Sequence, residues 1–423
     1  MMEFRNTTNC KKKVSALSYC KRIYLMGMIY IAVTSFFLFL VFEQILLKLA
    51  RKRYSLVIHV NGTRGKSTVT RMIHALLRSQ GMAVFGKTTG SKARFLLPDG
   101  TEKPVWRFGP ANVREQRNMM ILSAFSGKPQ KRALVFECNA VKEELQCVSM
   151  KWLKPDITVI TNVREDHVQE LGKPEQAALA FASAIPENSV LVTSEGNFRD
   201  TWEAAAKQKK LRFCYVEAQE AGNCAFPENA ACVLGVADYL GIDRTMALKS
   251  IAGHEPDAGA FGIYTWKTNS NPVFFADARA ANDVESTERL FAAAFRAVKP
   301  DKDAKRILLL INREDRPERT WGFLQYIIDQ NSALYFDQYF CFGHVPLPFR
   351  MALKRRGLNY KIIRHVKDLD CELGKIPEHT VFISGAGNYG GTGVLITQWL
   401  ETKRHQPDFT QISETSIWGT VQQ

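Results

Sequence analysis

The sequence has no pair of cysteines separated by two residues, although its 423 residues include nine cysteines. Such pairs are typical of structural zinc sites and redox motifs, so we expect neither. The number of cysteines is odd, and several lie within apolar runs such as "LVFECN". The sequence therefore predicts reduced thiols in a reducing compartment and not a disulfide framework.

Charged residues are absent from positions 23–42, which read "IYLMGMIYIAVTSFFLFLVF". A helix of twenty residues rises roughly 30 Å, the thickness of one hydrocarbon core. The run is longer than the apolar region of a secretory signal peptide, and no A-x-A cleavage pattern follows it. We therefore expect a retained transmembrane helix, with a buried core helix as the alternative.

The excess of positive charge is divided between the N-terminus and the rest of the chain. Residues 1–53 contain ten Lys and Arg against two acidic residues, a net +8, and the other 370 residues contain 47 against 40, a net +7. The second excess suits an anionic substrate, although it is also ordinary for a soluble domain. We do not expect nucleic acid as a partner.

A phosphate-binding loop is predicted at residues 62–67, which read Gly-Thr-Arg-Gly-Lys-Ser. The buried-strand pattern "SLVIHV" precedes this loop, and apolar residues at helical spacing follow it. The two glycines let the backbone approach phosphate oxygens, Lys66 can reach the β- and γ-phosphates, and the Ser67 hydroxyl can ligate Mg²⁺. Nucleotide contacts are expected from Gly62, Thr63, Arg64, Gly65, Lys66, Ser67 and Thr68. The general pattern also requires a glycine at position 60, where this sequence has valine, so a tight turn with an incidental lysine is the alternative.

The orientation of the apolar run follows from this loop. Both flanks of the run are basic, so the positive-inside rule does not decide its direction. A requirement for ATP places residue 54 onward in the cytoplasm. The expected location is the inner or plasma membrane, with the catalytic domains cytoplasmic.

The loop resembles the ATP loop of the Mur ligase family, whose members are ATP-dependent ligases of peptidoglycan, folate and polyglutamate synthesis. Three further stretches resemble that family: "ALVFECNAV" (133–141), "DITVITNVREDHVQELG" (156–172) and "FFADARAANDVEST" (274–287). The resemblance implies roles for particular side chains. The implied metal ligands are Ser67, Glu137 and His167; the implied catalytic residues are Lys66, Glu137, His167 and Arg279; and Asn162, Asp277 and Arg313 are implied at the nucleotide.

Within the family, the sequence resembles the membrane-associated synthases of poly-γ-glutamate capsules. An apolar anchor lies directly before the phosphate loop, and "PDAGAF" (256–261), "INREDRPERT" (311–320) and "SGAGNYGG" (384–391) fit that group. Arginine forks such as Arg313 suit carboxylate or phosphate, while a solvated charge cluster is equally open. The resemblance implies that glutamate is joined through its side-chain carboxylate via an acyl phosphate, with ATP and Mg²⁺ or Mn²⁺. It also implies a polyglutamate chain as substrate, small membrane subunits as partners, and a possible homo-oligomer.

The sequence also departs from the family. The family's carbamylated lysine, some fifteen residues after the motif histidine, has no counterpart in "ALAFASAIP". No UDP-sugar domain precedes the phosphate loop, because the apolar run occupies that place. This argues against a cell-wall substrate.

Apolar strands alternate with helical stretches, which indicates an α/β fold with parallel sheets. We expect an N-terminal basic segment with a transmembrane helix (1–53, with the helix at 23–42) and a central P-loop domain with a Mur-ligase-like parallel sheet (54–265). A C-terminal Rossmann-like domain (266–423) should follow, with "WKTNSNP" (266–272) as a hinge. Two other functions remain open at this point: a membrane-tethered P-loop ATPase that regulates or powers polymer export without forming a bond, and a non-catalytic scaffold.

Overall fold

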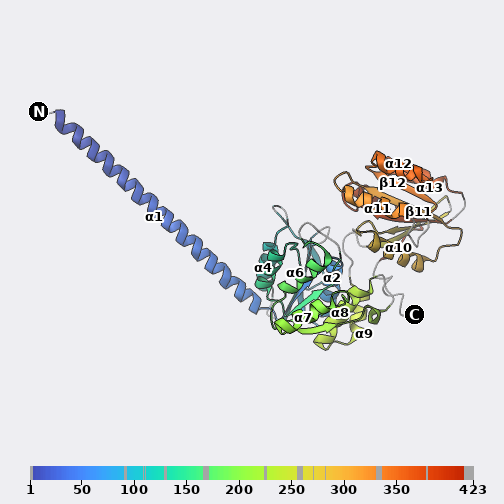
Figure 1. The fold of residues 1–423 in the computed structure, drawn as a ribbon, viewed down its shortest axis with the longest axis horizontal. Helices are drawn as coiled ribbons and strands as arrows, with labels where there is room; N and C mark the ends of the chain where they lie inside the picture. Colours follow the sequence, from blue (N-terminus) through green and yellow to red (C-terminus); the bar gives the residue numbers. More distant parts are fainter. Residues whose placement is uncertain are drawn as a thin grey trace.

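A computed structural model describes most of the chain. The described residues are 3–89, 93–107, 109, 111–127, 131–164, 171–222, 226–254, 261–269, 271–281, 283–329, 336–377 and 380–413, with side chains from residue 25 onward. Figure 1 shows one long N-terminal helix followed by two α/β domains. The predicted α/β class is confirmed.

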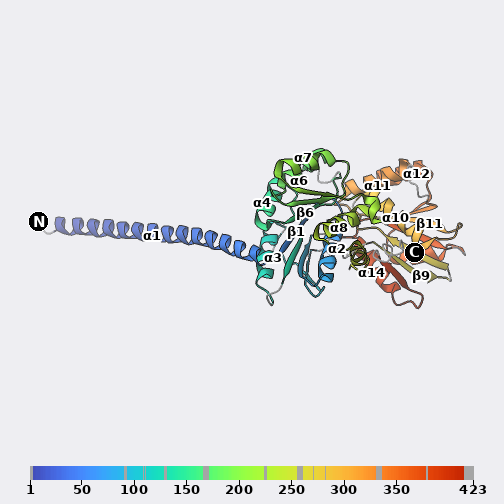
Figure 2. The ribbon, with the colours of Figure 1, turned by 90° about the horizontal axis from the view of Figure 1, so that it is seen from below.

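The long helix, α1 (Glu3–Lys52), continues without a break into the first domain (Figure 2). By length and composition, its part Leu25–Lys52 is the one described helix that could cross a membrane. The side chains at positions 25–42 are exposed, so this run is not a buried core helix. The last turns are different: Leu47 and Ala50 are buried against the first domain. The end of the expected N-terminal segment is therefore part of that domain's core.

The first sheet has eight strands in the order β4-β3-β2-β5-β1-β6-β7-β8. The strands are β1 (Leu56–Asn61), β2 (Ala83–Thr88), β3 (Arg94–Leu96), β4 (Glu102–Pro104), β5 (Arg132–Glu137), β6 (Ile157–Ile160), β7 (Val190–Thr193) and β8 (Arg212–Tyr215). All neighbouring strands are parallel except at one edge, where β3 runs antiparallel to both β2 and β4. The central strands are buried along their whole length because helices cover both faces of the sheet.

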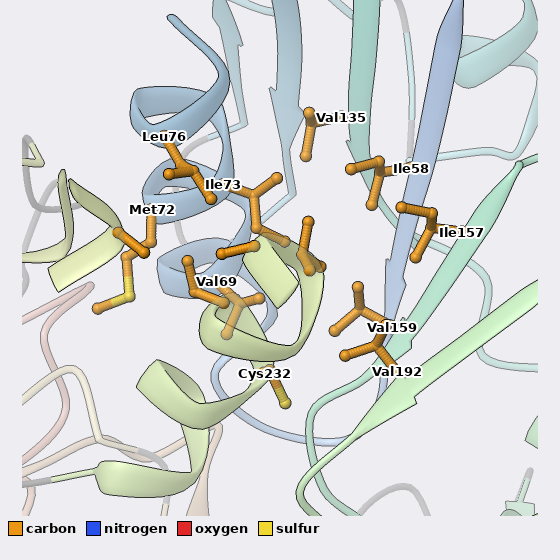
Figure 3. Packing of buried hydrophobic residues seen from close by; sticks show 14 of the residues in the cluster. Ile58, Val69, Met72, Ile73, Leu76, Val135, Ile157, Val159, Val192 and Cys232 are labelled. Atoms are coloured by element: carbon orange, nitrogen blue, oxygen red, sulfur yellow. The ribbon is translucent and has the colours of Figure 1, made fainter. Parts of the chain in front are cut away.

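One face of this sheet packs against α2 (Lys66–Ser79), α8 (Pro227–Leu240) and α9 (Arg244–Ala252). Figure 3 shows side chains of α2 at three- and four-residue spacing meeting branched residues of the strands. The other face packs against the end of α1 and against α3 (Arg114–Ala124), α4 (Glu143–Leu153), α6 (Pro174–Ala184) and α7 (Arg199–Lys209). A short 3₁₀ helix, η1 (Ala218–Ala221), precedes α8.

The second sheet has seven strands in the order β13-β12-β11-β14-β10-β9-β15. They are β9 (Gly262–Thr268), β10 (Asn271–Asp277), β11 (Lys305–Asn312), β12 (Gln338–Gly343), β13 (Tyr360–Ile363), β14 (Val381–Gly387) and β15 (Thr410–Ser413). Strands β13, β12, β11, β14 and β10 are parallel, while β9 runs antiparallel to both β10 and β15. One face carries α10 (Val284–Val298), α11 (Pro317–Asp329) and α12 (Leu347–Arg355), and the other carries α13 (Lys367–Gly374) and α14 (Gly393–Lys403).

The predicted hinge at 266–272 is wrong. Strand β9 pairs with β10 along its whole length, so the boundary expected between residues 265 and 266 lies inside β9. Trp266 is fully buried, with its ring edge-on to Trp399 at 5.4 Å between centroids. The described polar residues that suggested a linker lie at the end of β9, at the start of β10 and at Asn269, which has a positive φ of 48°.

Candidate active site

The phosphate loop lies between the end of β1 and the start of α2. Strand β1 is central, with β5 and β6 on either side, which is where open α/β sheets place ligand sites. Gly62 and Gly65 have φ angles of 123° and 76°, in the region that favours glycine. A Cβ atom would lie 2.3 Å from Thr161 Oγ1 at Gly62 and 2.2 Å from Asn229 Oδ1 at Gly65. The loop can therefore adopt this path only because both positions are glycine.

The loop presents positive groups. The Nζ atom of Lys66 donates hydrogen bonds to the carbonyl oxygens of Gly62 at 2.8 Å and Thr63 at 3.0 Å, so the ammonium lies across the loop. Gly65 is the N-cap of α2, and no side chain caps this helix. Its first N–H groups, with Thr68 in the first turn, can bind a phosphate, and the helix dipole adds to that attraction.

Ser67 and Glu137 meet beside the loop. The Ser67 hydroxyl donates to Glu137 Oε2 at 2.7 Å, and the backbone N–H of Thr89 donates to the same oxygen at 2.6 Å. Glu137 ends β5, which pairs with β1, and the residue is almost completely buried. A hydroxyl and a carboxylate oxygen at this separation are ligands that suit Mg²⁺. Among the residues that the structure describes, no three His, Cys, Asp or Glu side chains come together as a metal cluster.

Asn162 holds the phosphate loop through hydrogen bonds. Its Oδ1 accepts hydrogen bonds from Thr63 Oγ1 at 2.7 Å and from the backbone N–H of Arg64 at 3.0 Å, and its side chain is buried. In this arrangement Asn162 contacts the loop itself and holds Thr63 and Arg64 in place. The expected metal ligand His167, five residues later, lies outside the described residues.

Three buried residues around this site were not predicted from the sequence. Glu195 accepts the backbone N–H of Val163 at 3.0 Å and so holds the segment after Asn162. It follows the apolar strand "VLVT", a signal like the one that identified Glu137. Asn229 of α8 contacts Gly65, and no local pattern indicates this. Lys87 is a lysine within the apolar strand β2, and that contrast was a usable signal.

The C-terminal residues expected at the nucleotide bond to groups of their own domain. Arg279 has no exposed surface; it pairs with Asp277 through two hydrogen bonds of 2.7 and 2.6 Å and donates to the carbonyl oxygen of Gly393 at 2.5 Å. These bonds join β10 to the start of α14, so Arg279 is enclosed by its own domain and does not present its guanidinium to a nucleotide here. Arg313 pairs with Asp315, with Nε to Oδ1 at 2.9 Å, and lies against the glycine run at Gly391.

The two domains meet through ion pairs next to the loop. Arg64 of the loop lies 3.5 Å from Asp283, at the N-terminus of α10, and Arg289 of α10 pairs with Glu228 of α8 at 2.9 Å. Burial, together with the positive charges of Arg316 and Arg64, lowers the pKa of Arg319 on α11. Cationic side chains of both domains therefore gather beside the phosphate loop, an arrangement that favours anionic ligands.

Comparisons with known protein families find one match in each of the two α/β domains. Residues 60–229 match the Mur ligase middle domain, and residues 263–403 match the poly-gamma-glutamate synthase CapB C-terminal domain. The second match begins at residue 263, within β9.

Two curated relatives are similar over most of the chain. "PGA synthase CapB" of Bacillus subtilis (strain 168) is 32% identical over 371 residues, which cover 82% of this chain and 91% of the relative. "Capsule biosynthesis protein CapB" of Bacillus anthracis is 30% identical over 344 residues, which cover 77% of this chain and 71% of the relative.

Solved structures share the fold at low sequence identity. E. coli FolC in complex with ADP aligns with a TM-score of 0.57 at 16% identity, covering 85% of this chain and 94% of that one. MurF from Acinetobacter baumannii aligns with a TM-score of 0.58 at 14% identity, covering 85% and 80%. A bifunctional folylpolyglutamate synthase/dihydrofolate synthase with Mn, AMPPNP and L-glutamate bound aligns with a TM-score of 0.58 at 13% identity, covering 84% and 93%.

Proposed function

This chain belongs to the CapB family of poly-γ-glutamate synthases, and from that premise we propose that its site joins glutamate residues through their side-chain carboxylates by way of an acyl phosphate. It is an ATP-dependent, ADP-forming amide ligase of poly-γ-glutamate capsule synthesis. In the proposed reaction, a carboxylate oxygen takes the γ-phosphoryl group of ATP and ADP leaves. The nitrogen of an amine then attacks the carbonyl carbon, phosphate leaves, and the amine loses a proton.

The observation that carries this proposal is the contact between the Ser67 hydroxyl and the Glu137 carboxylate beside Lys66. Two anions, a carboxylate and the γ-phosphate, must approach each other before phosphoryl transfer. Bound Mg²⁺ would offset their repulsion, and Ser67, Glu137 and His167 are the residues that we propose to hold it. Lys66 follows the γ-phosphate, while the N–H groups of α2 bind the other phosphates. The Mn, AMPPNP and L-glutamate in the folylpolyglutamate synthase structure support divalent metal use in this fold.

The C-terminal domain should complete the site. Its contact with Arg64 through Asp283 brings it next to the loop, where it can exclude water that would hydrolyse the acyl phosphate. We assign Asp277 and Arg279 a positioning role, because both are buried and hold the start of α14. Arg313 remains our proposed contact for an anionic group, because its side chain is partly exposed beside the glycine run.

We also infer that α1 anchors the protein in the plasma membrane with both domains in the cytoplasm. The exposed apolar side chains at positions 25–42 and the need for ATP support this arrangement. Small membrane subunits and a homo-oligomer are further expectations for such a synthase.

The test is a paired measurement on the full chain in detergent micelles. Glu137→Gln and His167→Ala should retain nucleotide affinity by calorimetry, because binding rests mainly on the loop, and should lose glutamate-dependent ADP release. Glu203→Ala is the matched control, since Glu203 is an exposed carboxylate on α7 paired with Arg199. Normal turnover in both site variants would refute the metal assignment. ADP release by the parent protein without any amino acid would favour the ATPase alternative.

A further inference from the structure

Lys87 is a buried cation that the proposed mechanism does not use. It lies on β2 with no exposed surface, and its charge is paired with a carboxylate of α3. The nearest carboxylate oxygen, Glu115 Oε2, is 3.3 Å away. Burial lowers the pKa of Lys87, while the charge of Glu115 opposes that shift. A buried charge carries a desolvation penalty of several kcal/mol in proteins by order of magnitude, so its presence in an apolar strand suggests a specific role.

Glu115 connects this lysine to the surface. It accepts two hydrogen bonds from Arg107, from Nε at 2.7 Å and from the second guanidinium nitrogen at 3.0 Å. Partial burial raises the pKa of Glu115, but the hydrogen bond from Arg107 and the charge of Lys87 outweigh that effect and leave its pKa lowered. The side chain of Arg107 is 26% exposed, against 10% for Glu115 and none for Lys87. The cluster Lys87–Glu115–Arg107 thus runs from the core to solvent, ends in a guanidinium and has a net charge of +1.

This cluster lies next to the reacting edge of the sheet. Lys87 pairs across the sheet with Phe136, the residue before Glu137. Two residues after Lys87, the N–H of Thr89 bonds to the Glu137 carboxylate, on the side of β5 away from β1 and the phosphate loop. Lys87 shares the α3 face of the sheet with Phe85, and Glu137 alternates to the α2 face with Val135. The cluster therefore reaches the end of β5 from the face opposite to Ser67, and a substrate held at Glu137 can extend around this edge towards it.

We propose that Arg107 binds the free α-carboxylate of the glutamate residue whose γ-carboxylate is activated, with Glu115 and Lys87 as positioning residues. This inference rests on the proposed function. The two carboxyl carbons of one glutamate are separated by four single bonds of about 1.5 Å each, so they lie roughly 5 Å apart when extended. A substrate with two such neighbouring anions needs one cationic centre at the phosphoryl acceptor and another one residue's length away. Arginine suits the second position because its fork binds a carboxylate bidentately.

Pre-orientation by Glu115 explains why the cluster contains a carboxylate at all. The pair of bonds to Glu115 fixes one edge of the Arg107 guanidinium and leaves the remaining N–H groups for a ligand. Lys87 supplies the charge that keeps Glu115 ionised beneath it. A simple structural tie between β2 and α3 would need Lys87 and Glu115 but not a partly exposed Arg107.

The test removes the α-carboxylate from the substrate and the guanidinium from the protein, separately and together. The donors are the N-acetylated γ-linked glutamate dimer and the same dimer ending in 4-aminobutyrate, which lacks the terminal α-carboxylate. Hydroxylamine serves as the amine, so each turnover of the full chain in detergent yields ADP and a hydroxamate. The proteins are the parent, Arg107→Ala, Arg107→Lys and Glu115→Gln. Arg244→Ala is the matched control, because Arg244 is a partly exposed arginine that pairs bidentately with Asp238, outside the Lys87–Glu115–Arg107 cluster.

The parent and the control should prefer the glutamate-terminated dimer by about 10- to 100-fold in kcat/KM, the effect of one charge-assisted contact. Arg107→Ala should lose most of this preference through a raised KM for that dimer, with the KM for ATP and turnover of the 4-aminobutyrate dimer unchanged. Arg107→Lys and Glu115→Gln should retain part of it. An unaltered preference in Arg107→Ala, or an equal fall with both dimers, would overturn the inference while the ligase function stands. A parent that releases ADP with neither dimer would instead refute the proposed function, and this inference with it.

Discussion

Replacing Gly65 by alanine separates backbone strain from side-chain crowding at the phosphate loop. Gly65 and Gly81 flank α2 with nearly equal φ angles of 76° and 73°, but their surroundings differ. A Cβ atom at Gly81 meets nothing within 4 Å, whereas a Cβ atom at Gly65 lies 2.2 Å from Asn229 Oδ1. Gly81→Ala therefore measures the left-handed conformation alone, and Gly65→Ala measures that conformation plus the overlap with Asn229.

The magnitudes follow from these two terms. A left-handed conformation costs a non-glycine residue about 1–2 kcal/mol, and overpacking adds about 1–3 kcal/mol. Gly81→Ala should lower the thermal midpoint of the full chain in detergent, without nucleotide, by roughly 2–8 °C for a domain of this size. Gly65→Ala should lower it by roughly 4–20 °C.

Asn229→Ala provides the decisive comparison. The overlapping atom is the end of a side chain, so its removal should let Gly65→Ala fold with a loss close to that of Gly81→Ala, after correction for the single Asn229→Ala variant. The reasoning is refuted if Gly65→Ala and Gly81→Ala shift the midpoint equally, or if Asn229→Ala gives no rescue.

Three further predictions concern activity, the anchor and pH. Lys66→Ala should lower ATP-dependent turnover by orders of magnitude in a coupled ADP assay, while its unfolding free energy stays within about 0.5 kcal/mol of the parent; full activity would contradict the loop assignment. Deletion of 1–42 should yield a more thermostable protein than deletion of 1–53, because the longer deletion removes the packed end of α1; equal midpoints by scanning fluorimetry would count against that packing. Burial lowers the pKa values of His59 and His74 to about 4 in the folded protein. The unfolded chain binds a proton at each histidine near pH 6.5, so the folded state loses stability as pH falls from 6.5 towards 4. The loss is up to about 3 kcal/mol for each histidine. Midpoints measured from pH 7.5 to pH 5 should fall less steeply in His59→Gln, and an unchanged slope would contradict the buried neutral form.

The long strands of both sheets could be predicted from the sequence because each is an apolar run that ends at a polar or glycine residue. Strands β1, β5, β11 and β14 all have this form. The short strands β3, β4 and β13 could not be identified in this way. They have three or four residues and are only partly buried, so their pairing partners determine them rather than their own patterns.

The residues of the candidate site also fall into two groups, those that the sequence predicts and those that only the folded structure reveals. Glu137 ends one apolar strand, Asn162 lies two residues after another, and the loop that leads to Ser67 follows a third. Parallel strands bring such positions to one edge of the sheet. Asn229 and Glu115 lie on helices, and only tertiary packing brings them to the loop and to Lys87. The enclosure of Arg279 has the same cause, because its partner Gly393 is 114 residues away in the chain.

The unbroken path of α1 into the first domain has a mechanical consequence. A flexible linker would let the catalytic domains take many positions relative to the anchor. Helix α1 instead continues as one helix until its last turns lie in the core of the first domain. An ion pair of 2.8 Å between Glu43 and Arg117 of α3 fixes the helix where the apolar run ends, and Arg51 is held by Asp156 at 2.8 Å. The helix therefore fixes the distance and the orientation of the phosphate loop relative to the surface that holds residues 23–42. A polymer made at that loop would leave the site at a constant distance from this surface, so a protein that binds the polymer would need to reach only one position.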